Sequence, residues 1–250
     1  MATKNVLIIG SNRGIGLQLT KAFLRQSYDV FATTRPESRL NSSFRDLEET
    51  GATILELDFL DEKSIASAAR AYGNKPLDVL INVGGNHASP PPGAGVIPHK
   101  QLGLPQSPKP WKDQKSSLVL ERLRAMTIGP YLTMTEFLPQ LELATNPKVI
   151  NISSSFGSIS TNTFGTCLAY RTAKCALNQV SVTLAREWES EGRKTTITYV
   201  EPGFLSTGLT GWDGEDDMET CITGLMKIIS SISHEYNGAF LKWDGSKISF

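Results

Sequence analysis

The sequence is poor in the residues that build metal centres and disulfide frameworks. Among its 250 residues it has only three histidines and three cysteines. The histidines are His87, His99 and His234, and the cysteines are Cys167, Cys175 and Cys221. Scattered histidines and an odd number of cysteines without metal-ligand spacing give no candidate metal site. Unpaired thiols are typical of the reducing cytosol, so we expect a cytoplasmic protein without a bound metal.

The chain also lacks a charge excess and a long apolar run. Lysine plus arginine and aspartate plus glutamate number 25 each, so the formal net charge at pH 7 is zero. This balance gives no reason to expect nucleic acid or an anionic membrane as a partner. Apolar runs such as Val6 to Ile9 are far shorter than a bilayer requires. Because MATKNVLIIG leads directly into a strand-like run, no signal peptide is expected.

Short apolar runs alternate with segments of helical periodicity along the whole chain. The apolar runs predict strands at 5–10, 28–34, 53–57, 77–83, 149–152, 195–201 and 239–243. Apolar residues at helical spacing predict helices at 17–26, 62–72, 118–143, 168–191 and 218–233, the third adjusted at Pro130 and Pro139. This alternation indicates an α/β fold, a doubly wound parallel β-sheet flanked by helices. The length suits a single domain over residues 1–250.

A glycine-rich turn joins the first predicted strand to the first helix. Gly10, Gly14 and Gly16 follow the spacing G-x-x-x-G-x-G, which differs from the general dinucleotide fingerprint. Glycines allow a tight turn and a close approach of the backbone to a ligand, and the helix N-terminus offers N–H groups to a phosphate. Any sharp strand-to-helix turn can have this composition, but its place after the first strand favours a nucleotide site.

The second predicted strand ends without the acidic residue that commonly binds the ribose of NAD. It ends instead in Thr33-Thr34-Arg35, and Arg13 lies within the glycine turn. Two guanidinium groups suit the 2′-phosphate of NADP(H). The alternative is a pair of solvated surface arginines.

Polar residues and glycines follow the third and fourth predicted strands. Asp58 follows the third, and Asn82 and Gly84 end the fourth. Ligands of doubly wound sheets bind outside the carboxyl ends of the strands, although each of these residues could equally serve a turn. Residues 86–117 then interrupt the pattern with a proline-rich insertion. A stretch of this length without periodicity, placed beside the expected crevice, predicts a substrate lid.

The segment 149–174 carries the residues with the strongest chemical signal. An apolar run ends in the serines Ser153 to Ser155, and Tyr170 and Lys174 follow at a helical spacing of four. Tyr170 and Lys174 therefore share a helix face, and a nearby ammonium is expected to lower the pKa of the phenol. A phenol, an ammonium and a hydroxyl that converge suggest proton transfer to a carbonyl oxygen. Taken alone, however, a Tyr and a Lys four residues apart are common on helices and need have no catalytic role.

Taken in order, these segments resemble the classical short-chain dehydrogenase/reductase family, whose fold is a Rossmann-type sheet. The motifs are the glycine turn, Asp58, Asn82 to Gly85, Ser154 with Gly157, Tyr170-x-x-x-Lys174, and Pro202-Gly203 with Thr207. The resemblance spans nearly the full chain. Within the family, the stretches AYRTAKCALN and NGAFLKWDGSKISF are most similar to the sniffer, or C-factor, carbonyl-reductase branch.

The resemblance implies a reductase with NADPH or NADP+ as cofactor and a small-molecule carbonyl compound as substrate. Tyr170 would be the general acid, Lys174 would lower its pKa and bind the nicotinamide ribose, and Ser154 would hold the substrate oxygen. The implied cofactor-binding residues are Gly10, Asn12, Arg13, Gly14, Ile15, Gly16, Arg35, Asp58, Asn82, Gly84, Tyr170, Lys174, Pro202, Gly203 and Thr207. The choice between a homodimer and a homotetramer stays open.

One departure from the family pattern bears on turnover. Met126 stands where the family has an asparagine that helps to hold a water in the proton relay. This leaves two alternatives to an active reductase. The first is a regulatory NADP(H)-binding protein that lost the relay, and the second is an enzyme, for instance of secondary metabolism, that uses the pocket for a non-redox step. Ser154, Tyr170 and Lys174 favour the reductase.

Overall fold

In the computed structural model, which describes residues 3–84, 114–210 and 212–250, seven strands form one sheet. The strands are β1 Asn5–Ile9, β2 Asp29–Thr34, β3 Thr53–Glu56, β4 Val79–Asn82, β5 Lys148–Ile152, β6 Thr196–Glu201 and β7 Phe240–Lys242. Their order is β3-β2-β1-β4-β5-β6-β7, and all neighbours are parallel. The predicted doubly wound parallel sheet is confirmed, and its strand order reverses between β1 and β4, where such folds bind ligands.

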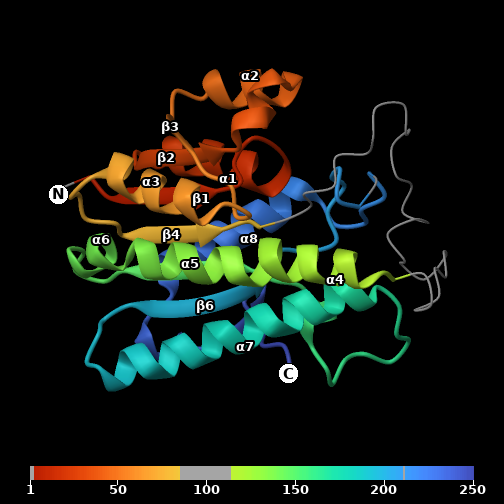
Figure 1. Ribbon diagram of the computed structural model, residues 1–250. Helices are drawn as coiled ribbons and strands as arrows, with labels where there is room; N and C mark the ends of the chain where they lie inside the picture. Colours follow the sequence, from red (N-terminus) through yellow and green to blue (C-terminus); the bar gives the residue numbers. More distant parts are fainter. Residues whose placement is uncertain (1–2, 85–113, 211) are drawn as a thin grey trace.

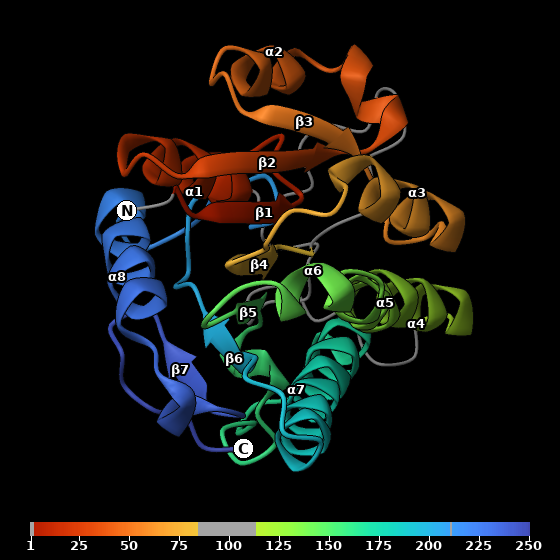
Figure 2. The ribbon, with the colours of Figure 1, turned by 90° about the vertical axis from the view of Figure 1, so that its left-hand side faces the viewer.

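Helices cover both faces of the sheet (Figures 1 and 2). Helices α1 Gly14–Arg25 and α8 Met218–Ser231 lie on one face, and α3 Glu62–Tyr72, α5 Gly129–Glu136 and α7 Leu168–Ser190 lie on the other. Strand β1 shows why two cores form, because successive side chains of a strand point to opposite faces. Its residues Val6 and Ile8 pack with α1 and α8, while Leu7 and Ile9 pack with α3, α5 and α7. A short helix, α2 Ser42–Glu48, was not expected from the sequence.

The predicted helix 118–143 is interrupted at its prolines. It consists of α4 Ser116–Leu123, a π-helical turn Arg124–Ile128, α5, and α6 Leu138–Glu142. Pro130 lacks the N–H that would bond to the Met126 carbonyl. The preceding turn is widened accordingly, and the N–H of Gly129 donates to the carbonyl of Arg124. Pro139 stands in the first turn of α6, where proline is tolerated.

Most of the proline-rich insertion predicted at 86–117 lies outside the described residues. At its end, Ser116 and Ser117 already belong to α4. The proposed lid is therefore an untested prediction for residues 86–113. In the described ranges no helix is both long and apolar enough to cross a membrane.

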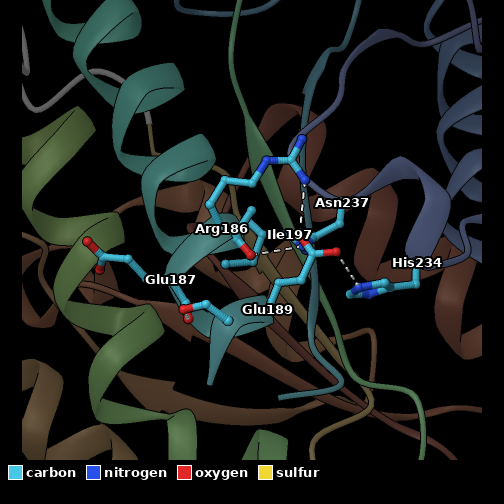
Figure 3. Close-up of polar contacts among 8 residues, drawn as sticks. Arg186, Glu187, Glu189, Ile197, His234 and Asn237 are labelled. Carbon is cyan, nitrogen blue, oxygen red and sulfur yellow. Dashed lines mark hydrogen bonds and ion pairs between the residues drawn. The ribbon is translucent and has the colours of Figure 1, made fainter. Parts of the chain in front are cut away.

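The side chain of Asn237, which follows α8, hydrogen-bonds both α7 and β6 (Figure 3). Its Oδ1 accepts the backbone N–H of Ile197 at 2.9 Å, and its Nδ2 donates to the carbonyl of Ala185 at 2.9 Å. Nearby, Glu189 accepts from Arg186 at 3.0 Å and contacts His234 at 3.1 Å, both on the surface. The buried amide thus connects α7 with β6, which both reach the candidate site at their other ends.

Candidate active site

The glycine turn is shaped by steric limits at its three glycines. Gly10 and Gly14 have φ values of +86° and +53°, which favour glycine. A Cβ at Gly16 would collide with the carbonyl oxygen of Gly10. Thr33 at the end of β2 closes the turn, because its Oγ1 accepts the N–H of Gly10 at 3.0 Å and its carbonyl accepts the N–H of Ser11 at 3.0 Å. Sequence analysis missed Thr33 and Ser11, whose residue types carry no distinctive signal.

Arg13 and Arg35 lie close enough to repel each other at this turn. The pKa of Arg13 is lowered by burial and by the charge of Arg35. Arg35 also forms an ion pair of 3.4 Å with Glu37, whose side chain is 60% exposed. Sequence analysis overlooked this acid, which lies three residues beyond the end of β2. Because an exposed pair holds the arginine weakly, an anion between the two guanidinium groups would relieve their repulsion.

The residues predicted after β3 and β4 to bind the cofactor make contacts with the backbone and the core. The Oδ1 of Asp58 accepts the N–H of Leu60 at 3.0 Å. Gly84 lies against the ring of Phe59, where a Cβ would be 2.9 Å from the ring edge. The side chain of Asn82 is turned into the core, where it donates to Asn151 and accepts from Thr133, each at 2.8 Å. A ribose could therefore meet Asn82 only through its backbone.

The structure separates the three serines that follow β5. Ser153 is buried, and its hydroxyl donates to Asn178 at 2.5 Å. The backbone N–H of Ser155 donates to Glu201 at 3.2 Å. Ser154 accepts the N–H of Phe156 at 3.2 Å, and its hydroxyl lies close enough to the phenol of Tyr170 to lower the pKa of that phenol. The structure thus brings together the serine and the tyrosine selected from the sequence.

The pKa of Tyr170 is raised to about 12, opposite to the direction expected from Lys174. Burial is the main cause, because a buried phenolate loses its hydration. The hydrogen bond from Ser154 lowers the pKa in part, the Glu201 carboxylate raises it further, and Arg122 lowers it. Lys174 is not among the groups that shift this pKa, so the lowering expected from its ammonium stays a prediction.

Lys174 is instead directed at two backbone carbonyls. Its Nζ donates to the carbonyl of Ile152 at 2.7 Å and to that of Gly84 at 3.3 Å, and it lies 5.8 Å from the centre of the Tyr170 ring. The side chain is buried, and burial lowers the pKa of the ammonium to about 7. An ammonium has three donors, so these carbonyls leave one N–H of Lys174 for a further partner.

A cavity of about 300 Å³ opens above Ser154 and Tyr170. Ile15, Pro202, Gly203 and Thr207, predicted from the sequence to contact the cofactor, line it. Thr207 also lies against Gly14, where a Cβ would be 3.6 Å from its methyl group, so the segment after β6 reaches the glycine turn. In the described ranges, no group of three or more histidine, cysteine, aspartate or glutamate residues is arranged to hold a metal ion.

Two charged residues of the cavity wall were missed by sequence analysis. Arg122 comes from α4, which packs on α7 (Figure 1), and Glu201 is the last residue of β6. Burial lowers the pKa of Arg122. The signal that could have identified Glu201 was its place at the carboxyl end of a strand, directly before Pro202 and Gly203.

Met126 lies in the π-helical turn and forms part of the same wall. It is fully buried and packs with Ala125 and Ala173, against which Tyr170 also rests. The thioether offers only a weak hydrogen-bond acceptor. The wall beside Tyr170 is therefore apolar where the family resemblance implied a residue that holds water.

Comparison with known proteins places this geometry in a family. The family model described as short chain dehydrogenase matches residues 4–217. An NADPH-bound carbonyl reductase from chicken fatty liver is 26% identical, with a TM-score of 0.83, and the carbonyl reductase Sniffer of D. melanogaster is 25% identical, with a TM-score of 0.84. Both alignments cover 100% of each chain. An uncharacterized oxidoreductase of Schizosaccharomyces pombe is 25% identical over 100% of both chains. The match of the family model over most of the chain shows that this protein belongs to the short-chain dehydrogenase family.

Proposed function

We propose that the protein is an NADPH-dependent reductase of a ketone or aldehyde, with Tyr170 as the general acid. The observation that carries the proposal is that Ser154 and Tyr170 line one cavity, with the serine hydroxyl close enough to the phenol to affect its pKa. Both groups can donate to one carbonyl oxygen, and Tyr170 can transfer its proton there. A cavity of about 300 Å³ suits a small organic substrate.

The residues present fit an NADP(H) cofactor. A side chain at Gly16 would collide with the carbonyl of Gly10, so this part of the glycine turn consists of backbone alone. A pyrophosphate that approaches the turn closely requires such a surface. A 2′-phosphate bound between Arg13 and Arg35 would relieve the repulsion between the two guanidinium groups. Bound NADPH would supply the hydride. The NADPH-bound chicken reductase supports this cofactor.

Tyr170 holds the proton that carbonyl reduction requires. Because burial raises its pKa to about 12, its phenol is protonated throughout the neutral range. Oxidation of an alcohol needs the phenolate, which burial disfavours. Lys174 orients the site by joining α7 to the strand ends, and we propose that its remaining N–H binds a ribose hydroxyl.

Cofactor preference provides the first test. Arg35→Ala should weaken NADPH binding tenfold or more and leave NADH binding nearly unchanged, because a charge-assisted hydrogen bond contributes about 1.5–3 kcal/mol. Dissociation constants from the quenching of protein fluorescence check this. The matched control is Arg39→Ala, four residues after Arg35. This change removes a surface ion pair with Glu56 and should not alter the preference for NADPH over NADH. Equal affinity of the wild type for both cofactors would contradict the assignment.

The proton donor is tested by Tyr170→Phe. The ring still packs against Phe156, but the acidic proton is lost, so the turnover number should fall by about 10²–10⁴-fold while NADPH binding stays nearly constant. Oxidation of NADPH in the presence of aromatic and alicyclic ketones is the assay. Tyr131→Phe on α5, where the ring is 40% exposed, should behave as wild type. Turnover by the Tyr170 variant at the wild-type rate would remove Tyr170 from the mechanism.

Met126 is the residue on which the choice between a reductase and a second candidate, a regulatory NADP(H)-binding protein, depends. We propose that the apolar wall at Met126 makes the protein a slow or substrate-restricted reductase, because it lacks a polar group to fix a water on the route by which Lys174 regains its proton. Met126→Asn should then raise the turnover of a poor ketone or alter its solvent-isotope dependence. It should also lower the free energy of unfolding by about 1–3 kcal/mol, because a polar group is buried.

The matched control for that variant is Met134→Asn on α5, which is also fully buried but belongs to a different apolar cluster and does not line the cavity. It should lose comparable stability without a gain in turnover. If Met126→Asn behaves in the same way, Met126 is a packing residue only. If neither wild type nor variant reduces any ketone while NADPH is bound, the regulatory candidate is favoured.

A further inference from the structure

Glu201 occupies the point where the pairing of β5 with β6 ends. The last backbone hydrogen bond between them runs from the N–H of Ser153 to the carbonyl of Val200, at 2.8 Å. In a parallel ladder the carbonyl of Ser153 would next accept an N–H from the residue after Glu201. That residue is Pro202, which has no N–H. The backbone ladder therefore stops one residue before Ser154.

The side chain of Glu201 continues the connection beyond this point. Its Oε1 accepts the N–H of Ser155 at 3.2 Å. Strand alternation explains the direction of the side chain, since Ile197 packs in the core that contains α7 and Glu201 lies four residues on, on the same face. The carboxylate is half-buried and lines the cavity.

The backbone that Glu201 holds is the turn that carries Ser154. Within this 3-10 turn, Ser155–Gly157, the Oγ of Ser154 accepts the N–H of Phe156 at 3.2 Å, and its carbonyl accepts the N–H of Gly157 at 2.8 Å. Those two bonds are internal to the turn. The bond to Glu201 ties the turn to the sheet, and a hydrogen bond to a charged acceptor is stronger than one to a neutral acceptor.

We propose that Glu201 is a positioning residue, whose carboxylate fixes the Ser154 turn so that the serine hydroxyl meets both Tyr170 and the substrate oxygen. The inference rests on the proposed reductase function for its kinetic consequence, but the hydrogen bond can be tested without it. Displacement of a substrate-binding group by about 1 Å can cost on the order of a hundredfold in rate.

The experiment compares Glu201→Ala with Glu201→Gln, because glutamine keeps the acceptor oxygen and loses only the charge. Hydrogen exchange of the Ser155 amide, followed at residue resolution in the folded protein, should accelerate in the alanine variant and stay slow in the glutamine variant. The turnover number should fall by about tenfold to a hundredfold in the alanine variant, with smaller changes in KM and NADPH binding. Glu235→Ala, at an exposed glutamate distant from the cavity, is the control. Glu201→Asp, which withdraws the carboxylate by one methylene, replaces the alanine variant should that protein not fold.

A double-mutant cycle shows whether Glu201 acts through Ser154. In a Ser154→Ala background, Glu201→Ala should cause no further loss of turnover, because coupled residues are non-additive. Unchanged exchange at Ser155, full additivity, or an equal loss of turnover in the glutamine variant would each overturn the proposal. If the wild type binds NADPH but reduces no carbonyl compound, the proposed reductase function fails, and exchange at Ser155 alone decides whether Glu201 holds the turn.

Discussion

The buried ammonium of Lys174 connects the three elements on which the site depends. Its hydrogen bonds to the carbonyls of Ile152 and Gly84 join α7 to the ends of β5 and β4. Because the lysine is one helical turn after Tyr170, the same contacts fix the height of the phenol above the sheet. A buried cation is costly unless hydrogen-bonded, so the position of α7 relative to the strand ends is strongly specified. With the phenol in place, the position of the Ser154 hydroxyl relative to it depends on the conformation of the turn after β5.

Burial, more than charge, sets the protonation of this site. It raises the pKa of Tyr170 to about 12 and lowers that of Lys174 to about 7, so burial disfavours the charged form of each group. The two charged residues of the wall, Arg122 and Glu201, act on the phenol in opposite directions. The phenol thus stays protonated near neutral pH, which suits a proton donor for carbonyl reduction. The family membership shown by the comparisons agrees with this chemistry.

Sequence patterns predicted the sheet and its helices well because periodicity and turn residues are local signals. Sequence patterns were less informative about side-chain directions and pKa values, which depend on contacts between residues far apart in the sequence. The direction of the Asn82 side chain depends on Asn151 and Thr133, which are remote in sequence. The pKa of Tyr170 depends on burial by several elements, which a spacing of four residues does not reveal.

Among the candidate site residues, the choice of Ser154 came from motif spacing. The structure supplies the physical reason, because Ser153 turns inward to Asn178 while Ser154 meets Tyr170. Glu201 escaped notice because no motif marks it. The positioning role that we propose for it follows from the missing N–H of Pro202, whose effect on the ladder depends on the pairing of β5 with β6.

The most direct test of this account follows the hydride itself. The protein would be given NADPH deuterated at the transferable position of the nicotinamide, together with a ketone that it turns over, and the product analysed by NMR. Hydride transfer from the cofactor to the bound ketone should give an alcohol with one deuterium on the former carbonyl carbon, in one stereochemical configuration. Bound cofactor with a product that carries no deuterium at that carbon would contradict it and would point to a non-redox use of the cavity.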